Sequence, residues 1–259
     1  MGLFGSAPQA VLEIAGLRKR FGAREVLKGV DVSVRPGELT VVLGANGSGK
    51  STLLRCAIRL LEPDAGSISL CGTDLLAARG EGLRAARRRA AMVFQQVLLV
   101  RRRTALENVA FGALGELPLH RSLSPRLFPE PVRARALESL ERVGLADRAG
   151  QRAATLSGGQ AQRVAIARAL CQRARVILAD EPVASLDPRA AESVLSLLAD
   201  VAKNENLGVL VVLHQPDLAR RYADRLIGFL DGGISFDRVP HEVSEDEVTV
   251  LYAADDVDD

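Results

Sequence analysis

The residues with the clearest chemical potential form one glycine-rich stretch, Gly44-Ala-Asn-Gly-Ser-Gly-Lys-Ser51. Its glycines allow backbone N–H groups to turn inward around phosphate oxygens. Lys50 would place its charge on the β- and γ-phosphates of a nucleotide, and the Ser51 hydroxyl would ligate Mg²⁺. The pattern therefore predicts a P-loop for ATP and Mg²⁺, rather than a glycine-rich turn with a surface lysine. The residues predicted to contact the nucleotide are Gly44, Ala45, Asn46, Gly47, Ser48, Gly49, Lys50, Ser51 and Thr52.

Two acidic residues at the end of another apolar stretch would complete this site. Residues 176–179 predict a buried strand, and Asp180 and Glu181 follow it at the edge where open α/β sheets bind ligands. We expect Asp180 to hold the magnesium. Glu181 alternates to the other face of the strand, where it would polarise the attacking water as the catalytic base. Adjacent acids also open ordinary loops, and their place beside a P-loop strand favours the catalytic interpretation.

Alternating strands and helices must position these groups. The apolar stretch 39–43 predicts a strand directly before the P-loop, and a helix is predicted after it, from about Lys50 to Leu61. After Gly158 helices alternate with strands again, which is typical of a mostly parallel sheet covered on both faces. Between about residues 96 and 157 prolines separate helical stretches, and this pattern predicts an inserted helical subdomain. The sequence therefore indicates an α/β fold.

Composition narrows the class of protein further. The 259 residues are 47% hydrophobic and 25% charged, and 34 basic against 32 acidic residues leave a formal charge of +2, so the balance does not argue for nucleic acid. Three widely spaced cysteines fit neither a disulfide framework nor a zinc site and suggest a reducing cytoplasm. No signal peptide is recognised, and no apolar run approaches the roughly 20 residues that span a bilayer, so another chain would provide any membrane span.

Several further motifs follow one another in a characteristic order. Leu156-Ser-Gly-Gly-Gln160 precedes the acidic pair, Phe94-Gln95 follows a predicted strand, and Ser185-Leu-Asp187 follows the acidic pair. His214 comes after the strand 209–213, and Phe21 precedes the second strand. With this ordered set the chain resembles the ABC-type ATPases over residues 10 to 240. The resemblance implies an ABC nucleotide-binding domain over 10–245, with an antiparallel β subdomain and the helical insertion at about 96–157, and an acidic tail over 246–259, in which we expect Asp255–Asp259 to be disordered.

The resemblance also implies roles for these residues. Ser157, Gly159 and Gln160 belong to a signature that would contact the ATP held by a second copy of the chain, so that two chains enclose two nucleotides. Ser157 also suits a helix cap, and both roles can hold together. Asp187 would lie beside the nucleotide in the same interface.

Three other residues are predicted to contact the nucleotide or its metal. Gln95 would contact Mg²⁺ and the attacking water, and it would couple the site to the helical insertion. His214 would hydrogen-bond the γ-phosphate and orient Glu181. Phe21 would stack on adenine. The alternatives are a solvated loop glutamine, a polar cap after a strand and a core aromatic side chain.

Three stretches of the sequence resemble those of the phosphonate-import ATPases within this family. They are 178–188, 213–224 with Gln215 after His214, and Phe94-Gln-Gln followed by Leu106-Glu-Asn-Val109. This resemblance implies an ATPase of a phosphonate importer at the cytoplasmic face of the membrane. Its partners would be a second copy of the chain when ATP is bound, two integral membrane permease subunits and an extracytoplasmic substrate-binding protein. Arg101–Arg103 would meet the permease or lipid headgroups, unless it is a solvated basic face.

The sequence also bears on functions other than transport of phosphonate. The chain could serve an ABC transporter for another substrate, because none of these stretches contacts a transported molecule. An ABC ATPase that acts on nucleic acid would separate its two phosphate motifs by a long coiled coil, and no sustained heptad run is present. A GTPase would carry an Asn-Lys-x-Asp motif, which Lys203-Asn-Glu-Asn206 does not match. We therefore expect no nucleic-acid partner.

Overall fold

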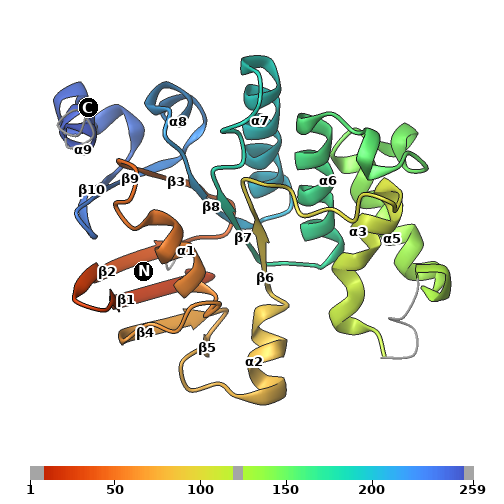
Figure 1. Ribbon diagram of the computed structural model, residues 1–259, viewed down its shortest axis with the longest axis horizontal. Coiled ribbons are helices and arrows are strands. Elements are labelled where there is room, and N and C mark those ends of the chain that lie inside the picture. The colour runs from red at the N-terminus through yellow and green to blue at the C-terminus, as the bar shows by residue number, and fades with distance from the viewer. Residues whose placement is uncertain (1–8, 119–124, 254–259) are drawn as a thin grey trace, which may run out of the picture.

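The computed structural model describes residues 9–118 and 125–253 (Figure 1). The strands are β1 (Leu12–Phe21), β2 (Arg24–Val34), β3 (Leu39–Leu43), β4 (Ala65–Leu70), β5 (Thr73–Asp74), β6 (Ala90–Val93), β7 (Val176–Asp180), β8 (Gly208–Val212), β9 (Arg225–Leu230) and β10 (Gly233–Arg238). The α-helices are α1 (Lys50–Ala57), α2 (Gly80–Arg87), α3 (Ala105–Ala110), α5 (Glu130–Arg142), α6 (Gly158–Cys171), α7 (Pro188–Asn204), α8 (Pro216–Tyr222) and α9 (Glu245–Tyr252).

A six-stranded sheet forms the centre of the molecule, with the strand order β10-β9-β3-β8-β7-β6. The pairs from β9 to β6 are parallel, and only β10 joins its neighbour antiparallel. β3, β7 and β8 are buried along their whole length, which explains why each reads as a continuous apolar run. The predicted α/β fold with a mostly parallel sheet is confirmed.

The two faces of this sheet carry separate cores. Alternate residues of β3 show the division: Val41 and Leu43 pack on the side of α3, α5, α6 and α7, and Val42 packs on the side of α1 and the first strands. Because successive side chains of a strand point to opposite faces, β7 is divided in the same way. The carboxyl ends of β3 and β7 therefore lie at one edge of a sheet that is packed on both sides.

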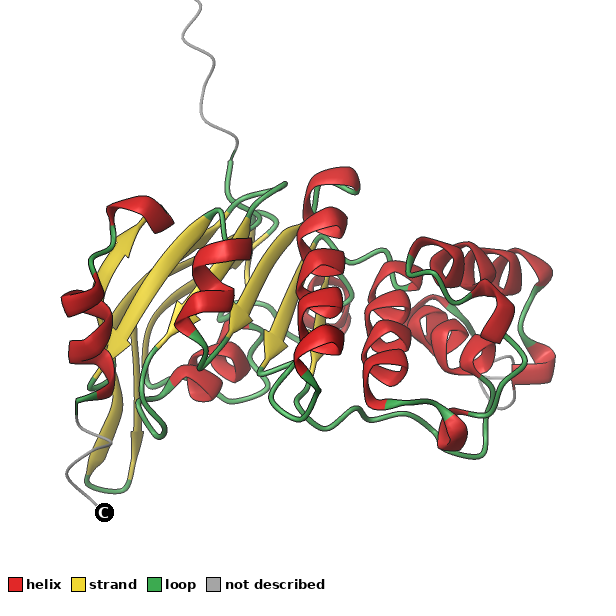
Figure 2. Ribbon diagram, turned by 90° about the horizontal axis from the view of Figure 1, so that it is seen from above, coloured by secondary structure: helices red, strands yellow, loops and turns green. Residues whose placement is uncertain are grey.

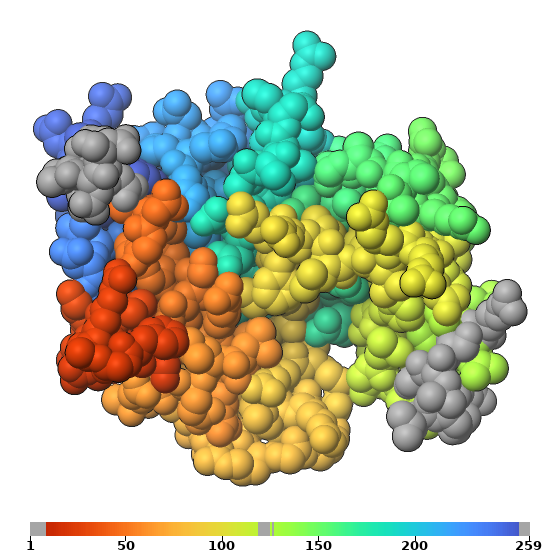
Figure 3. All heavy atoms as spheres, in the orientation of Figure 1, coloured from red at the N-terminus to blue at the C-terminus, as the bar shows by residue number. Residues whose placement is uncertain are grey.

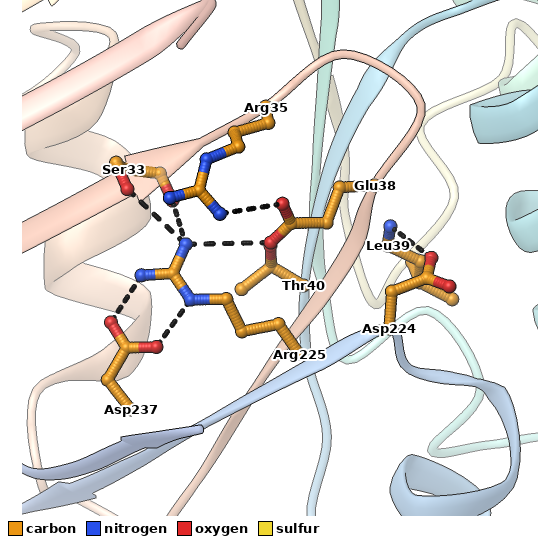
Figure 4. A network of polar contacts seen from close by, with 8 residues as sticks. All are labelled: Ser33, Arg35, Glu38, Leu39, Thr40, Asp224, Arg225 and Asp237. Carbon is orange, nitrogen blue, oxygen red and sulfur yellow. Dashed lines mark hydrogen bonds and ion pairs between the residues drawn. The ribbon is translucent and has the colours of Figure 1, made fainter. Parts of the chain in front are cut away.

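A second, antiparallel sheet with the order β2-β1-β4-β5 covers the face on which α1 lies. Arg225 on β9 ties this sheet to the six-stranded one, as Figure 4 shows. Its guanidinium donates to the carboxylate of Asp237 on β10 and to the backbone oxygen of Ser33 on β2, 2.9 Å away. Glu38 accepts from Arg225 (3.5 Å) and from the hydroxyl of Thr40 on β3 (3.0 Å).

Every α-helix described between residues 96 and 157 belongs to a lobe at the β6 edge of the sheet. In Figure 2 α3 and α5 lie beyond the last strand, and in Figure 3 the same segment stands to one side, coloured yellow to green. The N-terminal half of α3 is held by a capping box between Thr104 and Glu107. α6 packs against both α3 and α5 and so joins the lobe to the sheet. None of the described helices is long and apolar enough to cross a membrane.

One helix boundary and the end of the folded domain differ from those that the sequence predicts. The helix predicted to reach Leu61 ends at Ala57, because Arg59 adopts a left-handed φ of +54° and Leu60 N donates back to Arg55 O (2.8 Å). At the other end of the chain, α9 begins at Glu245 and buries Val248 and Leu251 in the core. The folded domain therefore extends past its predicted end at residue 245, into the tail predicted over 246–259. Asp255–Asp259 lie outside the described residues.

Candidate nucleotide-binding and hydrolysis site

The glycine-rich stretch Gly44–Ser51 forms a loop between β3 and α1. Its first glycine is required by space as well as by conformation: φ is +154°, and a Cβ at Gly44 would lie 2.2 Å from the backbone oxygen of Phe229. At Gly49 φ is +115°, and a Cβ would lie 2.9 Å from Val26 O. Both positions exclude a side chain, so the neighbouring strands β9 and β2 determine the shape of the loop.

Lys50 is the first residue of α1 and is only 4% exposed. Its ammonium group donates to Gly44 O (2.8 Å) and Ala45 O (2.6 Å) and lies 3.4 Å from the hydroxyl of Ser48. The loop thus encloses its own cation, with the positive end of the α1 dipole beside it. This arrangement suits the binding of phosphate oxygens at the helix N-terminus.

Ser51 and Asp180 meet although 129 residues separate them. The Ser51 hydroxyl donates to Asp180 Oδ1 at 2.7 Å, and Asp180 is 7% exposed at the end of β7. Two oxygen donors side by side fit Mg²⁺, which proteins bind through one or two oxygens together with phosphates and water. Within the described residues no group of three or more His, Cys, Asp and Glu side chains forms an all-protein metal site.

Glu181 and His214 form the second polar pair of the site. His214 Nε2 lies 2.5 Å from Glu181 Oε1, and both side chains are about three-quarters buried. Glu181 holds a left-handed φ of +48°, and its N–H donates to Val212 O at 3.2 Å. Left-handed backbone at a residue other than glycine costs of order 1 to 3 kcal/mol, and such strain is concentrated at functional sites. The histidine therefore orients a carboxylate that the backbone turns out of the strand.

A cavity of about 260 Å³ brings these groups together. Among the predicted residues, Asn46, Gly47, Gly49, Lys50, Ser51, Thr52 and Glu181 line it. Glu181 also faces an adjoining hollow of about 150 Å³ with His214 and Gln215, so the carboxylate stands at the boundary between the two spaces. The P-loop and its proposed catalytic base thus share one cavity.

Two residues of β2 line the same cavity and were missed from the sequence, namely Arg24 and Val26. Arg24 donates to Gly47 O at 3.4 Å. The residue chosen instead, Phe21, does not line the cavity; it is 50% exposed, with the ammonium of Lys19 5.7 Å from its ring centroid. Phe21 pairs with Arg24 across the β1–β2 turn. The turn at Gly22 was the sequence signal for this hairpin, and the hairpin register places Arg24 opposite Phe21. Adenine stacking by Phe21 stays a prediction.

The signature residues lie elsewhere on the surface. Ser157 caps α6, where its hydroxyl accepts from Gln160 N (3.3 Å) while Gln160 Oε1 accepts from Ser157 N (2.9 Å). Ser157, Gly159 and Gln160 line a hollow of about 360 Å³ that shares no residue with the P-loop cavity. The capping role is confirmed. In one chain, however, the signature is not brought to the P-loop.

Gln95 and Asp187 are also outside the P-loop cavity. Gln95 is exposed and lines another hollow of about 360 Å³ beside Gly158 and Ser185. Asp187 is exposed and caps α7, with its carboxylate accepting from Ala190 N at 3.0 Å. Their contacts with metal and nucleotide stay predictions.

Gln162 is a further residue that the sequence did not single out. It lies on α6, is 2% exposed, and its Nε2 donates to Phe94 O (3.4 Å) and Gln95 O (3.3 Å). Its Oε1 is buried without a hydrogen-bond partner. A polar residue on a helix that is otherwise apolar on its buried side was the available signal. Gln162 joins the signature helix to the backbone of the segment that carries Gln95.

The fold and the site define a P-loop ATPase of the ABC type. The family model described as ABC transporter matches residues 27–184, so this chain belongs to the ABC transporter family. It is 46% identical over 94% of its length to phosphonates import ATP-binding protein PhnC 1 of Ruegeria sp. (95% of that protein). It is 48% identical over 95% of its length to phosphonates import ATP-binding protein PhnC of Frankia casuarinae (97% of that protein).

Solved structures agree with this assignment. A nucleotide-free ATP-binding cassette from an ABC transporter is 29% identical, with a TM-score of 0.78 over 94% of this chain and 95% of that one. A dimeric ATP-binding cassette in a post-hydrolysis state, bound to ADP and Pi, is 33% identical, with a TM-score of 0.73 over 88% of this chain and 98% of that one. The ABC-type fold predicted from the motifs is confirmed.

Proposed function

We propose that this chain is the ATP-hydrolysing subunit of an ABC importer for phosphonates or a related phosphorus oxyanion. The observation that carries the proposal is the cavity in which the P-loop meets Glu181, itself bonded to His214. Relatives that are 46 to 48% identical over nearly the whole chain, and whose names describe phosphonate import, support the substrate class.

The geometry supports hydrolysis by an oriented water. The N–H groups of the P-loop and the ammonium of Lys50 hold the phosphates and stabilise the charge that spreads over their oxygens. Ser51 and Asp180 would hold Mg²⁺, which neutralises phosphate charge when it is bound. Glu181 borders the cavity at the P-loop, so its carboxylate can accept a hydrogen bond from a water placed against the γ-phosphate, while His214 keeps that carboxylate in position.

The separation of the two hollows supports a dimer with shared sites. Ser157 and Gly159 present a hydroxyl and an N–H at the start of α6, a geometry suited to phosphate. Because one chain does not bring them to its own P-loop, a second copy would place its signature on the nucleotide. Binding of ATP would close this pair of chains, and hydrolysis with phosphate release would reopen it. Asp187 and Gln95 would join the nucleotide in the closed pair.

The transported substrate would pass through other chains. Two integral membrane permease subunits would hold this pair of ATPases at the cytoplasmic face of the membrane, and an extracytoplasmic binding protein would deliver the phosphonate. The segment after Gln95 supports this docking: Leu98 and Val100 are 63% and 48% exposed, and Arg101 and Arg102 follow them on the surface. Exposed apolar side chains beside cations that pair with no described residue fit contact with a permease segment better than contact with water alone.

Reconstitution tests the substrate directly. The chain would be purified in complex with a phosphonate-type permease and placed in liposomes together with a phosphonate-binding protein. We expect methylphosphonate-loaded binding protein to stimulate ATP hydrolysis, and sulfate in place of methylphosphonate not to do so. The Glu181→Gln complex is the control for contaminating ATPases. Stimulation by an unrelated substrate alone would assign the chain to another importer and leave the ATPase intact.

A further inference from the structure

A hollow of about 590 Å³ opens at the end of the six-stranded sheet opposite the P-loop. Three arginines line it: Arg89, Arg173 and Arg175. The other described residues that line it include no acidic and no aromatic side chain. Three positive charges therefore face one concave surface, and none of its described lining residues carries a carboxylate.

These arginines have almost no partners of their own. Within residues 9–118 and 125–253, the side chains of Arg173 and Arg175 make no hydrogen bond or ion pair. The Arg89 guanidinium donates at 3.5 Å to the backbone oxygen of Cys71. Most arginine side chains on a protein surface extend into water. Arginines of one concave surface instead combine their electric fields and raise the local concentration of anions.

Rigid elements hold the three positions. Arg89 stands directly before β6 and Arg175 directly before β7, and Arg89 O accepts from Arg175 N at 2.7 Å. Arg173 ends α6 in the left-handed conformation, at φ +59°, with its N–H donating to Leu170 O at 2.9 Å. The backbone that brings the guanidinium groups together is thus part of the sheet and of a helix end.

We propose that this hollow is a second anion site, which binds a small phosphorus oxyanion carrying at least two negative charges. Its volume lies within the range of small-molecule sites, roughly 300 to 1,000 Å³. The planar fork of an arginine matches the geometry of phosphate oxygens and can bind two of them at once. A nucleic acid is disfavoured because single strands bind on aromatic side chains along an extended groove, and the described part of the lining has no aromatic side chain.

The proposed site is separate from the nucleotide cavity and independent of the proposed transport function. β7 spans five residues from Arg175 to the acidic pair, which places its two ends roughly 15 Å apart. A ligand held by Arg173 and Arg175 is therefore out of reach of Lys50. Binding at the two places can be measured separately.

Cys71 offers a local probe, because it lines the hollow and is partly exposed. The other cysteines, Cys56 and Cys171, are fully buried, and burial raises the pKa of both thiols, to about 11 for Cys56. The experiment measures the rate at which N-ethylmaleimide alkylates Cys71 in the full chain, located by mass spectrometry. Methylphosphonate, inorganic phosphate and pyrophosphate are compared with chloride at equal ionic strength. We expect saturable protection of Cys71 by the phosphorus anions.

Variants separate this site from its alternatives. Removing Arg173 and Arg175 as Arg173→Gln with Arg175→Gln should weaken the protecting anion by about tenfold for each charge, as expected for hydrogen bonds between charged groups. Arg152→Gln with Arg189→Gln removes the same charge from exposed positions elsewhere and should leave protection unchanged, as should Lys50→Ala. Line broadening of the methylphosphonate ³¹P signal by the wild-type chain and these three variants measures binding without the thiol. Equal loss in both double variants, or no saturable binding by either measurement, would overturn the proposal.

Discussion

The P-loop region and the signature region of one chain are built in opposite ways. At the P-loop, side chains from distant segments bond across the site: Ser51 reaches Asp180, and His214 reaches Glu181 from 33 residues away. At the signature, Ser157 and Gln160 bond to each other within one turn of α6. In the P-loop region, hydrogen bonds within the chain already connect the separate segments that form the site. The signature region presents its helix end to the outside.

This difference identifies what each region requires. The P-loop cavity contains both the groups that hold phosphate and the carboxylate proposed to act on water. The signature hollow has a hydroxyl and helix N–H groups but neither a P-loop nor an acidic pair. A phosphate bound by both would need two chains facing each other, as in the symmetric pairing common among homodimers. Substitutions in either region therefore test this division of roles.

The largest effect is expected from Glu181→Gln. The P-loop stays intact, so ATP should still bind, while turnover should fall by roughly a hundredfold to ten-thousandfold because a general base contributes about that much. With hydrolysis blocked, the chain should accumulate as a closed dimer in ATP. Steady-state phosphate release and size-exclusion chromatography with and without ATP measure the two effects.

Glu141→Gln is the matched control, because this glutamate is exposed on α5 and does not line the P-loop cavity. It should change neither turnover nor dimerisation. Undiminished phosphate release by Glu181→Gln would remove Glu181 from the role of base.

A mixing experiment tests whether the two regions act across chains. Ser157→Arg should place a bulky cation where the signature meets phosphate, and Lys50→Ala should remove the P-loop charge, so each homodimer should be inactive. In a mixed dimer, one site combines an intact P-loop with an intact signature. Random association gives half mixed dimers, so activity should return to about a quarter of the wild-type level if the sites act independently.

Mass spectrometry of the intact complex verifies the mixed dimers. Re-mixing of two Lys50→Ala samples, which offers no intact P-loop, is the control and should recover nothing. Mixed dimers without activity would show that a single chain supplies both regions or that both sites must be intact.

The parts that the sequence predicted correctly were those that local pattern specifies. The strand 39–43 and its P-loop, the acidic pair at the end of β7 and the cap at Ser157 each depend on a few consecutive residues. Arg24 was missed because it enters the cavity through the register of a hairpin. The end of α1 was missed because Arg59 occupies a left-handed position that is usual for glycine, so no breaker marks it.

Contacts between distant segments could not be predicted from local sequence patterns either, because they depend on how the elements pack. Gln162 bonds to the backbone of residues 67 and 68 positions earlier, and the helical period of α6 places it only on a buried face. Its role could be inferred only after α6 and β6 had been placed side by side. Gln172 makes the equivalent contact at the other end of β6, with its Nε2 donating to Arg88 O (3.0 Å) and Ala90 O (2.8 Å).

Substitutions of these two glutamines are expected to have the smallest effects, and the two variants should differ in where they act. Gln162→Leu should leave Phe94 O and Gln95 O without this donor and should speed hydrogen exchange at residues 95–97, where α6 meets the segment that carries Gln95. Stability should change by no more than about 1 kcal/mol, since the two lost bonds are long and a buried oxygen without a partner disappears with them. Gln172→Leu breaks two shorter bonds at the opposite end of β6, so it should cost more stability and leave exchange at 95–97 unchanged. Thermal unfolding and exchange measured by mass spectrometry distinguish the pair, and equal exchange in both variants would mean that Gln162 only fills space between α6 and the sheet.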